Sequence, residues 1–204
     1  MKDRNCKKQS MDKNVFANET VRSILEENKE KIELIRKYNY NTAEHSINVC
    51  ALSVACGYEM KLSEKDIKTL GTGALLHDIG KTMIPEQILL KPGKLTEEEM
   101  NIMKRHPEYG KLMLNETDAV TDIVLYHHEN EDGSGYPAII GKVPLLAKIV
   151  HIADVYDALI RDRPYKKTYK PSEAIEYLYR GSGTLFCADI VKEFVRSLPD
   201  HKKV

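Results

Sequence analysis

Apolar residues recur at helical spacing along most of the chain. Val21, Ile24, Leu25, Ile32 and Ile35 stand three, four and seven residues apart, as the buried face of an amphipathic helix requires. Sustained alternation of apolar and polar residues, the pattern of a half-buried strand, is found nowhere in the sequence. The pattern therefore predicts an all-α protein built as a helical bundle.

Capping residues indicate where the next helices begin and end. A helix is expected from Thr42 to about Gly57, a residue suited to a C-cap, and another after Ser63. Thr96 opens a capping box, and its helix is expected to reach the residues just before Pro107. Further helices are expected at 120–127, at 145–159 after Pro144, at 172–180 and at about 187–198.

Length and composition narrow the class of protein. The 204 residues suit one domain, expected at 16–204, while the polar residues 1–15 lack periodicity and are expected to form a disordered or loosely packed arm. Lys+Arg and Asp+Glu both number 31, so no basic excess favours a nucleic-acid polymer or an anionic membrane as partner. No signal peptide or membrane span is visible, and the four scattered cysteines are typical of a reducing compartment. A cytoplasmic protein is expected.

Histidines and aspartates gather at the predicted helix ends. The set contains His45 in a first turn, His77 and Asp78 at a helix end, His106 before a proline, His127 and His128 before a glycine-rich loop, and Asp154 in mid-helix. Imidazole and carboxylate together bind divalent transition metals. The set is too large for one tetrahedral ion and suits two ions, with Asp78 as the bridge.

Each member of this set also has an ordinary structural interpretation. A lone histidine is more often a hydrogen-bonded residue than a ligand, and a histidine pair at a helix C-terminus is favoured by the helix dipole. The metal hypothesis therefore depends on the ordered set as a whole. His151 and His201 lie outside the set and are interpreted as structural or solvated residues.

The order of these residues resembles a known family. His45, His77-Asp78 and Asp154 resemble the HD phosphohydrolase superfamily. A longer series of blocks resembles the HD-GYP subfamily: Leu76 to Lys81, His106-Pro107, His127-His128-Glu129, Asp132 to Pro137, Ile152 to Leu159, and Arg163-Pro164-Tyr165. These blocks extend over about 40–195, nearly the whole predicted domain.

The resemblance implies an all-helical fold, a bi- or trinuclear metal centre, and hydrolysis of cyclic di-GMP. Linear pGpG is the expected first product, and further cleavage to GMP is left open. By this resemblance the seven residues above are expected to be metal ligands. Asp78 and Lys81 are expected to be the catalytic residues. Lys81 and Arg163 match positions that touch substrate phosphate, for which an ammonium and a planar guanidinium are suited. Tyr136 matches a position beside the substrate, in a Gly-Tyr-Pro loop through which a regulatory protein partner is expected.

Three residues depart from the family pattern. Asn41 stands where trinuclear members carry a glutamate ligand, so two metal ions are expected, with iron or manganese as the first candidates. Glu131 stands where an aromatic or large apolar residue is usual, which is expected to change loop packing or partner choice. Cys187 replaces the aspartate that begins the last helix, at an expected cost of about 1 kcal/mol in capping.

Two alternatives stay open. The chain could hydrolyse another cyclic dinucleotide or nucleotide, because the sequence does not identify the residues that contact the bases. It could instead be a sensor that binds cyclic di-GMP without cleaving it, although all seven ligand positions are retained. The native metal, the extent of cleavage, the oligomeric state and the regulatory partner are open as well.

Overall fold

All regular secondary structure in the described residues is helical. The computed structural model describes residues 17–114, 118–138, 142–161 and 168–199, and within these ranges the only β feature is an isolated bridge between Ser182 and Phe186. The all-α prediction is confirmed. None of the described helices combines the length and the apolar character needed to cross a membrane. The predicted arm at 1–15 lies outside the described residues, so the domain boundary stays a prediction.

The helices follow one another through short connections. After helical residues 17–27 come α2 (Lys29–Tyr38), α3 (Tyr40–Glu59), α4 (Glu64–Leu76), the 3-10 helix η1 (Ile79–Met83), α5 (Glu86–Leu89), α6 (Glu97–Met103), α7 (His106–Leu114), α8 (Ala119–Tyr126), α9 (Leu145–Ile160), α10 (Pro171–Arg180) and α11 (Ala188–Ser197).

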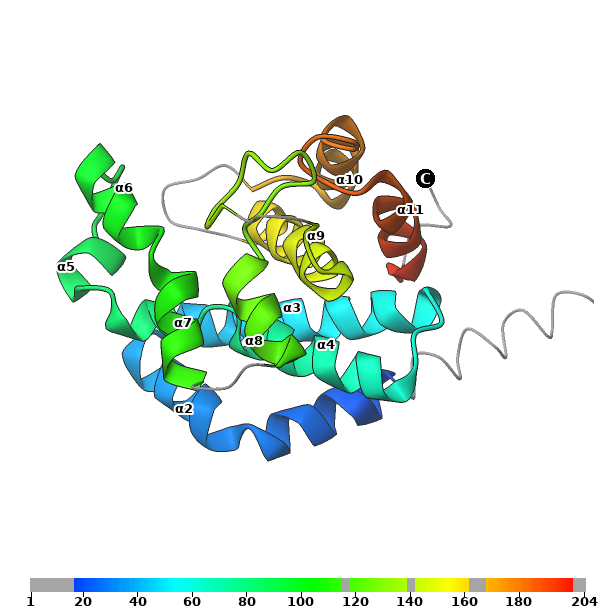
Figure 1. Cartoon of the computed structure of the whole chain (residues 1–204), viewed down its shortest axis with the longest axis horizontal. Helices are drawn as coiled ribbons and strands as arrows, with labels where there is room; N and C mark the ends of the chain where they lie inside the picture. The colour runs from blue at the N-terminus through cyan, green and yellow to red at the C-terminus, as the bar shows by residue number, and fades with distance from the viewer. Residues whose placement is uncertain (1–16, 115–117, 139–141, 162–167, 200–204) are drawn as a thin grey trace, which may run out of the picture.

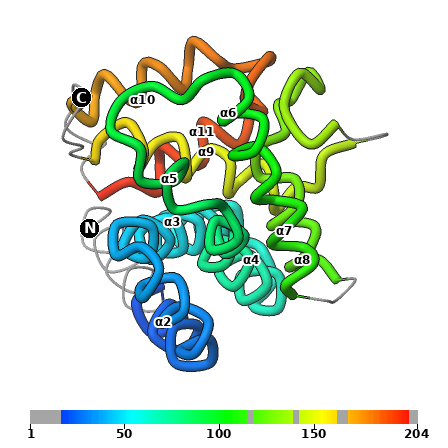
Figure 2. The backbone as a smooth tube through the Cα atoms, turned by 90° about the vertical axis from the view of Figure 1, so that its left-hand side faces the viewer, coloured from blue at the N-terminus to red at the C-terminus, as the bar shows by residue number. Residues whose placement is uncertain are grey.

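Helix α3 lies at the centre of the bundle (Figure 1). α2 and α4 pack along one side of α3, and α9 and α11 pack along the other. α8 packs between α4 and α9, α7 packs against α8 and η1, and α10 covers α9. α5 and α6 lie at the edge of the molecule beyond α7 (Figure 1), and in the turned view this edge faces the viewer, in front of the other helices (Figure 2).

The core is apolar and continuous through these helices. Its fully buried side chains include Leu70 and Leu75 of α4, Ile149 and Ile152 of α9, and Phe194 of α11. Full burial of each such side chain contributes roughly 1.5–3 kcal/mol. The bundle therefore has a source of stability separate from the polar site described below.

Most predicted helix starts are confirmed, but one predicted end is wrong. Ser63 caps α4 by accepting a hydrogen bond from the amide of Asp66, and Thr96 forms the predicted capping box with Glu99. Gly57 is not a C-cap, because it is buried inside α3, which continues to Glu59.

Two further expectations about helix bounds are corrected. α3 begins at Tyr40, capped by Asn39, so His45 lies in the second turn of its helix and not in the first. α6 ends at Met103, and His106 begins α7 instead of ending a helix. Pro107 fits this start because the amide that proline lacks has no helical partner in a first turn.

Candidate metal centre

The structure brings the seven predicted ligand residues into one buried site. His77 follows α4, Asp78 precedes η1, His106 begins α7, and His127 and His128 follow α8, so these five come from helix ends. His45 and Asp154 come instead from the interiors of α3 and α9. Two groups have ligand atoms within 4.8 Å of one another, one of Asp78, His106, His127 and His128 and one of His45, His77 and Asp78. Asp78 belongs to both groups.

Three of the histidines are oriented by the main chain. The Nδ1 atoms of His77, His106 and His127 lie 2.7, 2.9 and 2.8 Å from the carbonyl oxygens of the residues three positions earlier. A carbonyl only accepts hydrogen bonds, so each Nδ1 carries the proton and each Nε2 presents a lone pair. The helix ends thus fix both the tautomer and the direction of these rings.

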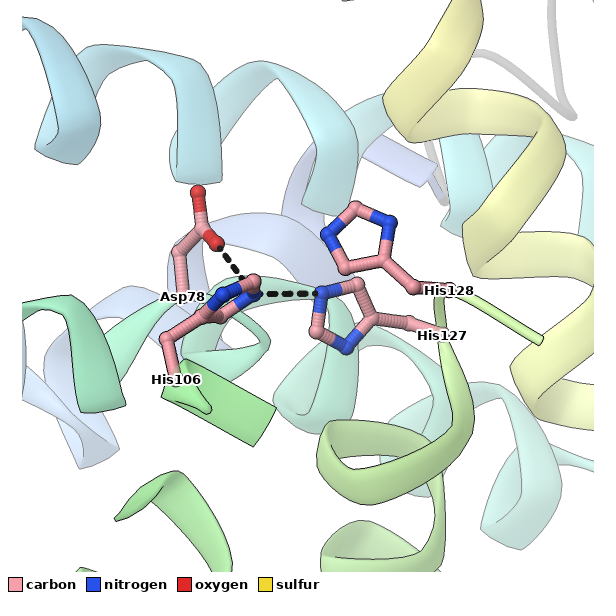
Figure 3. A group of neighbouring side chains, drawn as sticks. All are labelled: Asp78, His106, His127 and His128. Carbon is pink, nitrogen blue, oxygen red and sulfur yellow. Dashed lines mark hydrogen bonds and ion pairs between the residues drawn. The ribbon is translucent and has the colours of Figure 1, made fainter. Parts of the chain in front are cut away.

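The lone pairs converge on one another, as Figure 3 shows for His106 and His127. Their Nε2 atoms lie 3.2 Å apart, and His106 Nε2 lies 3.3 Å from Asp78 Oδ1. Burial lowers the pKa of His106 to about 4 and holds the pKa of His127 well below its usual range, so neither ring supplies a proton at neutral pH. Facing acceptors repel one another, and a cation between them removes that repulsion.

Asp78 lies at the middle of this cluster of acceptors. Burial opposes ionisation, but Lys81, with Nζ 2.6 Å from Oδ2, and the neighbouring histidines hold the pKa of Asp78 well below its usual range. Among the described residues, Asp78 Oδ1 and His77 Nε2 are buried polar atoms without a hydrogen bond. A buried polar atom left unpaired costs about 1–3 kcal/mol, and both atoms could bind a metal ion.

His45 is held differently, by two carboxylates. Its Nε2 lies 2.8 Å from Asp154 Oδ1, and its Nδ1 lies 2.6 Å from Asp157 Oδ2. Burial acts against the charged ring, but these two hydrogen bonds raise the pKa of His45 to about 9. A metal ion at Nε2 would replace the proton shared with Asp154, while Asp157 would keep the proton on Nδ1.

The sequence pattern singled out Asp154 but not Asp157, the second carboxylate that orients His45, nor the two residues that hold Asp157. Asp157 accepts hydrogen bonds from Asn48 Nδ2 at 3.0 Å and from Arg161 Nε at 3.0 Å, in addition to its contact with His45. The spacing could have shown them, because Asn48 follows His45 by three residues and Asp157 follows Asp154 by three.

Gly80 permits the close packing that places His106. A Cβ atom at Gly80 would lie 2.0 Å from the carbonyl oxygen of His106 and 2.4 Å from the amide nitrogen of Gly110. Only glycine lets η1 approach the start of α7 so closely. The glycine two residues after Asp78 therefore fixes the distance between two members of the site.

The Gly-Tyr-Pro loop packs its tyrosine on the centre. The rings of Tyr136 and His128 are stacked, with centroids 4.7 Å apart, and the amide of Tyr136 donates to the carbonyl of His128. Buried Glu129 holds the loop by accepting a hydrogen bond from the amide of Gly135 at 2.7 Å. Gly133 has a positive φ of 79°, as expected of a glycine turn.

The remaining sequence expectations have separate outcomes. Arg163 lies outside the described residues. His151 donates from Nδ1 to the carbonyl of His127 at 2.8 Å, in keeping with a structural residue. Glu131 pairs with Lys148 of α9 at 2.7 Å, which ties the loop to that helix. Cys187 is the N-cap of α11 and makes no side-chain capping bond.

These features fit divalent metal ions. Inward-facing imidazole lone pairs, a low-pKa carboxylate common to both groups and two unpaired buried ligand atoms form a donor set suited to transition metals. Asp154 adds a carboxylate 4.0 Å from His77 Nε2 and 3.9 Å from His128 Nδ1. Figure 3 shows four of the side chains pointing toward a common centre.

Comparison with known proteins matches residues 19–190 to the HD domain family. The chain is 40% identical over 163 residues to a cyclic di-GMP phosphodiesterase of Pseudomonas aeruginosa, which covers 77% of this chain and 39% of that protein. It is 47% identical over 141 residues to the cyclic di-GMP phosphodiesterase response regulator RpfG of Xanthomonas campestris, and the match covers 64% of this chain and 37% of that protein. A 3'3'-cGAMP-specific phosphodiesterase of Vibrio cholerae is 37% identical over 156 residues, and the match covers 68% of this chain and 30% of that protein.

Among solved structures, a HDG"Y"P protein from Bdellovibrio bacteriovorus has the same fold. Its TM-score is 0.63 at 20% identity, and the match covers 91% of this chain and 63% of that one. At that identity the likeness concerns the fold alone. The chain spans between 30% and 39% of the length of the three curated relatives above.

Proposed function

This chain belongs to the HD domain family, and we propose that it is a metal-dependent phosphodiesterase that hydrolyses cyclic di-GMP to linear pGpG. The observation that carries the proposal is the set of buried acceptors facing one another around Asp78. Support for the substrate comes from the relatives whose names include cyclic di-GMP phosphodiesterase.

The proposal assigns two divalent ions, with iron or manganese as the first candidates. One site would use His45, His77 and Asp78, and the other Asp78, His106, His127 and His128, with Asp154 beside both. Asn41, at the position of a third-metal ligand in trinuclear relatives, favours two ions over three. Bound divalent ions act as Lewis acids on a phosphoryl group and lower the pKa of water for attack at phosphorus.

The chain's own cations would stabilise the transition state. Lys81 forms an ion pair with Asp78 in this structure, so a small change of its side chain would bring its ammonium into contact with a phosphate bound at the centre. Arg163 would bind a phosphate oxygen through its planar guanidinium. Both charges would offset the negative charge that builds on the equatorial oxygens, without a covalent enzyme intermediate.

The loop residues would bound the substrate site. Tyr136, stacked on His128, places an aromatic ring beside the proposed ions, where it can contact a nucleotide. A regulatory protein contacting the Gly-Tyr-Pro loop could act on this ring and on His128 together. We also place the activity in the cytoplasm, in keeping with the buried free thiols of Cys50 and Cys56.

A related cyclic dinucleotide is the second candidate substrate, because one relative is named as specific for 3'3'-cGAMP. The test is anaerobic purification with elemental analysis, followed by turnover of cyclic di-GMP, cyclic di-AMP and 3'3'-cGAMP under one assay. We expect two metal ions per chain and fastest turnover of cyclic di-GMP. Three tightly bound ions would contradict the stoichiometry, and binding of cyclic di-GMP without cleavage by metal-loaded protein would identify a sensor.

A further inference from the structure

A cavity of about 390 Å³ opens beside the metal centre, between α3 and the end of α9. Its lining includes Tyr40, Asn41, Glu44, Asp157, Ile160 and Arg161. The volume lies within the roughly 300–1,000 Å³ of ordinary small-molecule sites. It is therefore large enough to hold a nucleobase.

Asp157 connects this cavity to the centre. Its carboxylate lines the cavity and also lies 2.6 Å from Nδ1 of His45, whose opposite nitrogen faces Asp154. One side chain thus separates the cavity from the proposed ions. A nucleotide whose phosphate lies at the centre could place its base in the cavity.

The charged residues of the lining complement a guanine base. Arg161 donates from Nε to Asp157, and a guanidinium has five N–H donors, so further donors can serve the O6 and N7 acceptors of guanine. Glu44 supplies a carboxylate, which accepts hydrogen bonds from ring N1–H and N2–H₂ donors. Adenine has no such pair of adjacent donors, and its N1 lone pair would face the carboxylate.

The two apolar members suit the faces of the same base. Tyr40 is 62% exposed, so its ring is free of the core and available for stacking. Stacking of a base on an aromatic side chain is worth about 1–3 kcal/mol and does not depend on the identity of the base. Ile160 offers an apolar contact. In this arrangement Tyr40 provides affinity, and Glu44 and Arg161 provide selectivity.

We propose that this cavity is a guanine subsite, in which Glu44 and Arg161 read the base edge of the substrate. The inference rests on the proposed function, because it places a second part of the dinucleotide relative to the ions. Its carboxylates could also attract a cation, but the guanidinium of Arg161 on Asp157 opposes one there.

The test compares the dissociation constants of guanosine and adenosine 5'-monophosphate for the metal-loaded full chain, measured by calorimetry. Neither monoester is a phosphodiester, so binding is measured without cleavage. We expect the unmodified protein to bind the guanosine nucleotide about tenfold more tightly or better. Glu44→Gln and Arg161→Ala should each bring that ratio close to one, and the preference in kcat/KM for cyclic di-GMP over cyclic di-AMP should fall in parallel.

Two matched variants serve as controls. Arg36 forms ion pairs with both Glu33 and Glu44, but only Glu44 lines the cavity. Glu33→Gln therefore removes a comparable carboxylate without altering the cavity lining. Arg180→Ala removes an arginine paired with an acidic residue four positions earlier, as Arg161 is with Asp157. Both controls should keep the base preference of the unmodified protein.

Three results would overturn the guanine subsite: no base preference in the unmodified protein, an unchanged preference in both Glu44→Gln and Arg161→Ala, or loss of one metal ion from Glu44→Gln. Failure of the proposed function looks different, as the unmodified protein would cleave no cyclic dinucleotide. The binding ratios and their dependence on Glu44 decide the subsite in either case.

Discussion

The two sides of the proposed metal centre are built by different means. On one side His77, His106 and His127 are oriented by backbone carbonyls three residues earlier in the chain. On the other side His45 is oriented by the side chains of Asp154 and Asp157, from a helix more than 100 residues away in sequence. The first side depends on local helix geometry, and the second depends on the packing of α3 against α9.

This difference has consequences for how each side can change. No single substitution removes a backbone carbonyl, so the orientation of the first three rings is protected as long as their helix ends form. The orientation of His45 can be altered by replacing Asp157 or the residues that hold it. Since Arg161 contacts Asp157 and lines the neighbouring cavity, binding at the proposed guanine subsite would influence the orientation of His45 on the second side.

The largest effect is expected from Asp78, which belongs to both ligand groups. Asp78→Ala should release both metal ions and abolish turnover, because Asp78 is the residue that the two ligand groups share. The helical fold should persist, because the apolar core is separate. Elemental analysis, circular dichroism and a turnover assay measure the three outcomes, with the exposed Asp66→Ala as control. Full metal occupancy in Asp78→Ala would refute the bridging assignment.

Lys81 should have the next largest effect, since it contacts Asp78 without belonging to either ligand group. Lys81→Ala should retain its metal ions and lower kcat by about two orders of magnitude, as expected for loss of one oriented electrostatic stabiliser. Steady-state kinetics with Lys91→Ala, a lysine paired with Glu99 elsewhere, provide the comparison. A rise in KM alone, with kcat intact, would mean that Lys81 binds ground state and transition state equally.

Substitution of Asp157 tests most directly whether the two sides of the centre are independent. Asp157→Asn should weaken metal binding at the His45 side by about 10–100-fold, the usual consequence of losing a carboxylate that orients a ligating histidine. The ion on the His106 and His127 side should be retained, because those two rings are held by main-chain carbonyls and not by Asp157. Competition with a chelator should therefore show one weakened site and one unchanged site. Equal weakening of both would show that the two sides are not independent.

The smallest effect is expected from Asn48, which donates one hydrogen bond to Asp157. Asn48→Ala should weaken the His45-side metal site in the same direction as Asp157→Asn, by about 1 kcal/mol or less. The same chelator competition measures it. An effect larger than that of Asp157→Asn would mean that Asn48 acts on the centre by a route other than Asp157.

Much of the site could be predicted from the sequence because its members carry distinctive chemistry. The seven candidate ligand residues, the capping box at Thr96 and the cap at Ser63 follow from residue type and from the order and spacing of the residues. The wrong prediction of a C-cap at Gly57 also has a local cause. Glycine suits both a helix end and a close helix contact, so the pattern at Gly57 did not distinguish between them.

The sequence by itself determined the helical class, the approximate helices and the set of candidate ligands, since helical periodicity and capping are properties of neighbouring residues. Only the tertiary structure decided which lone pairs face one another, that Asp157 orients His45, and that a cavity with Glu44 and Arg161 adjoins the centre. The hydrogen bond between His45 and Asp157, for example, joins residues 112 positions apart. The geometry of these relations comes from how α3, α4, α8 and α9 pack, which no local pattern encodes.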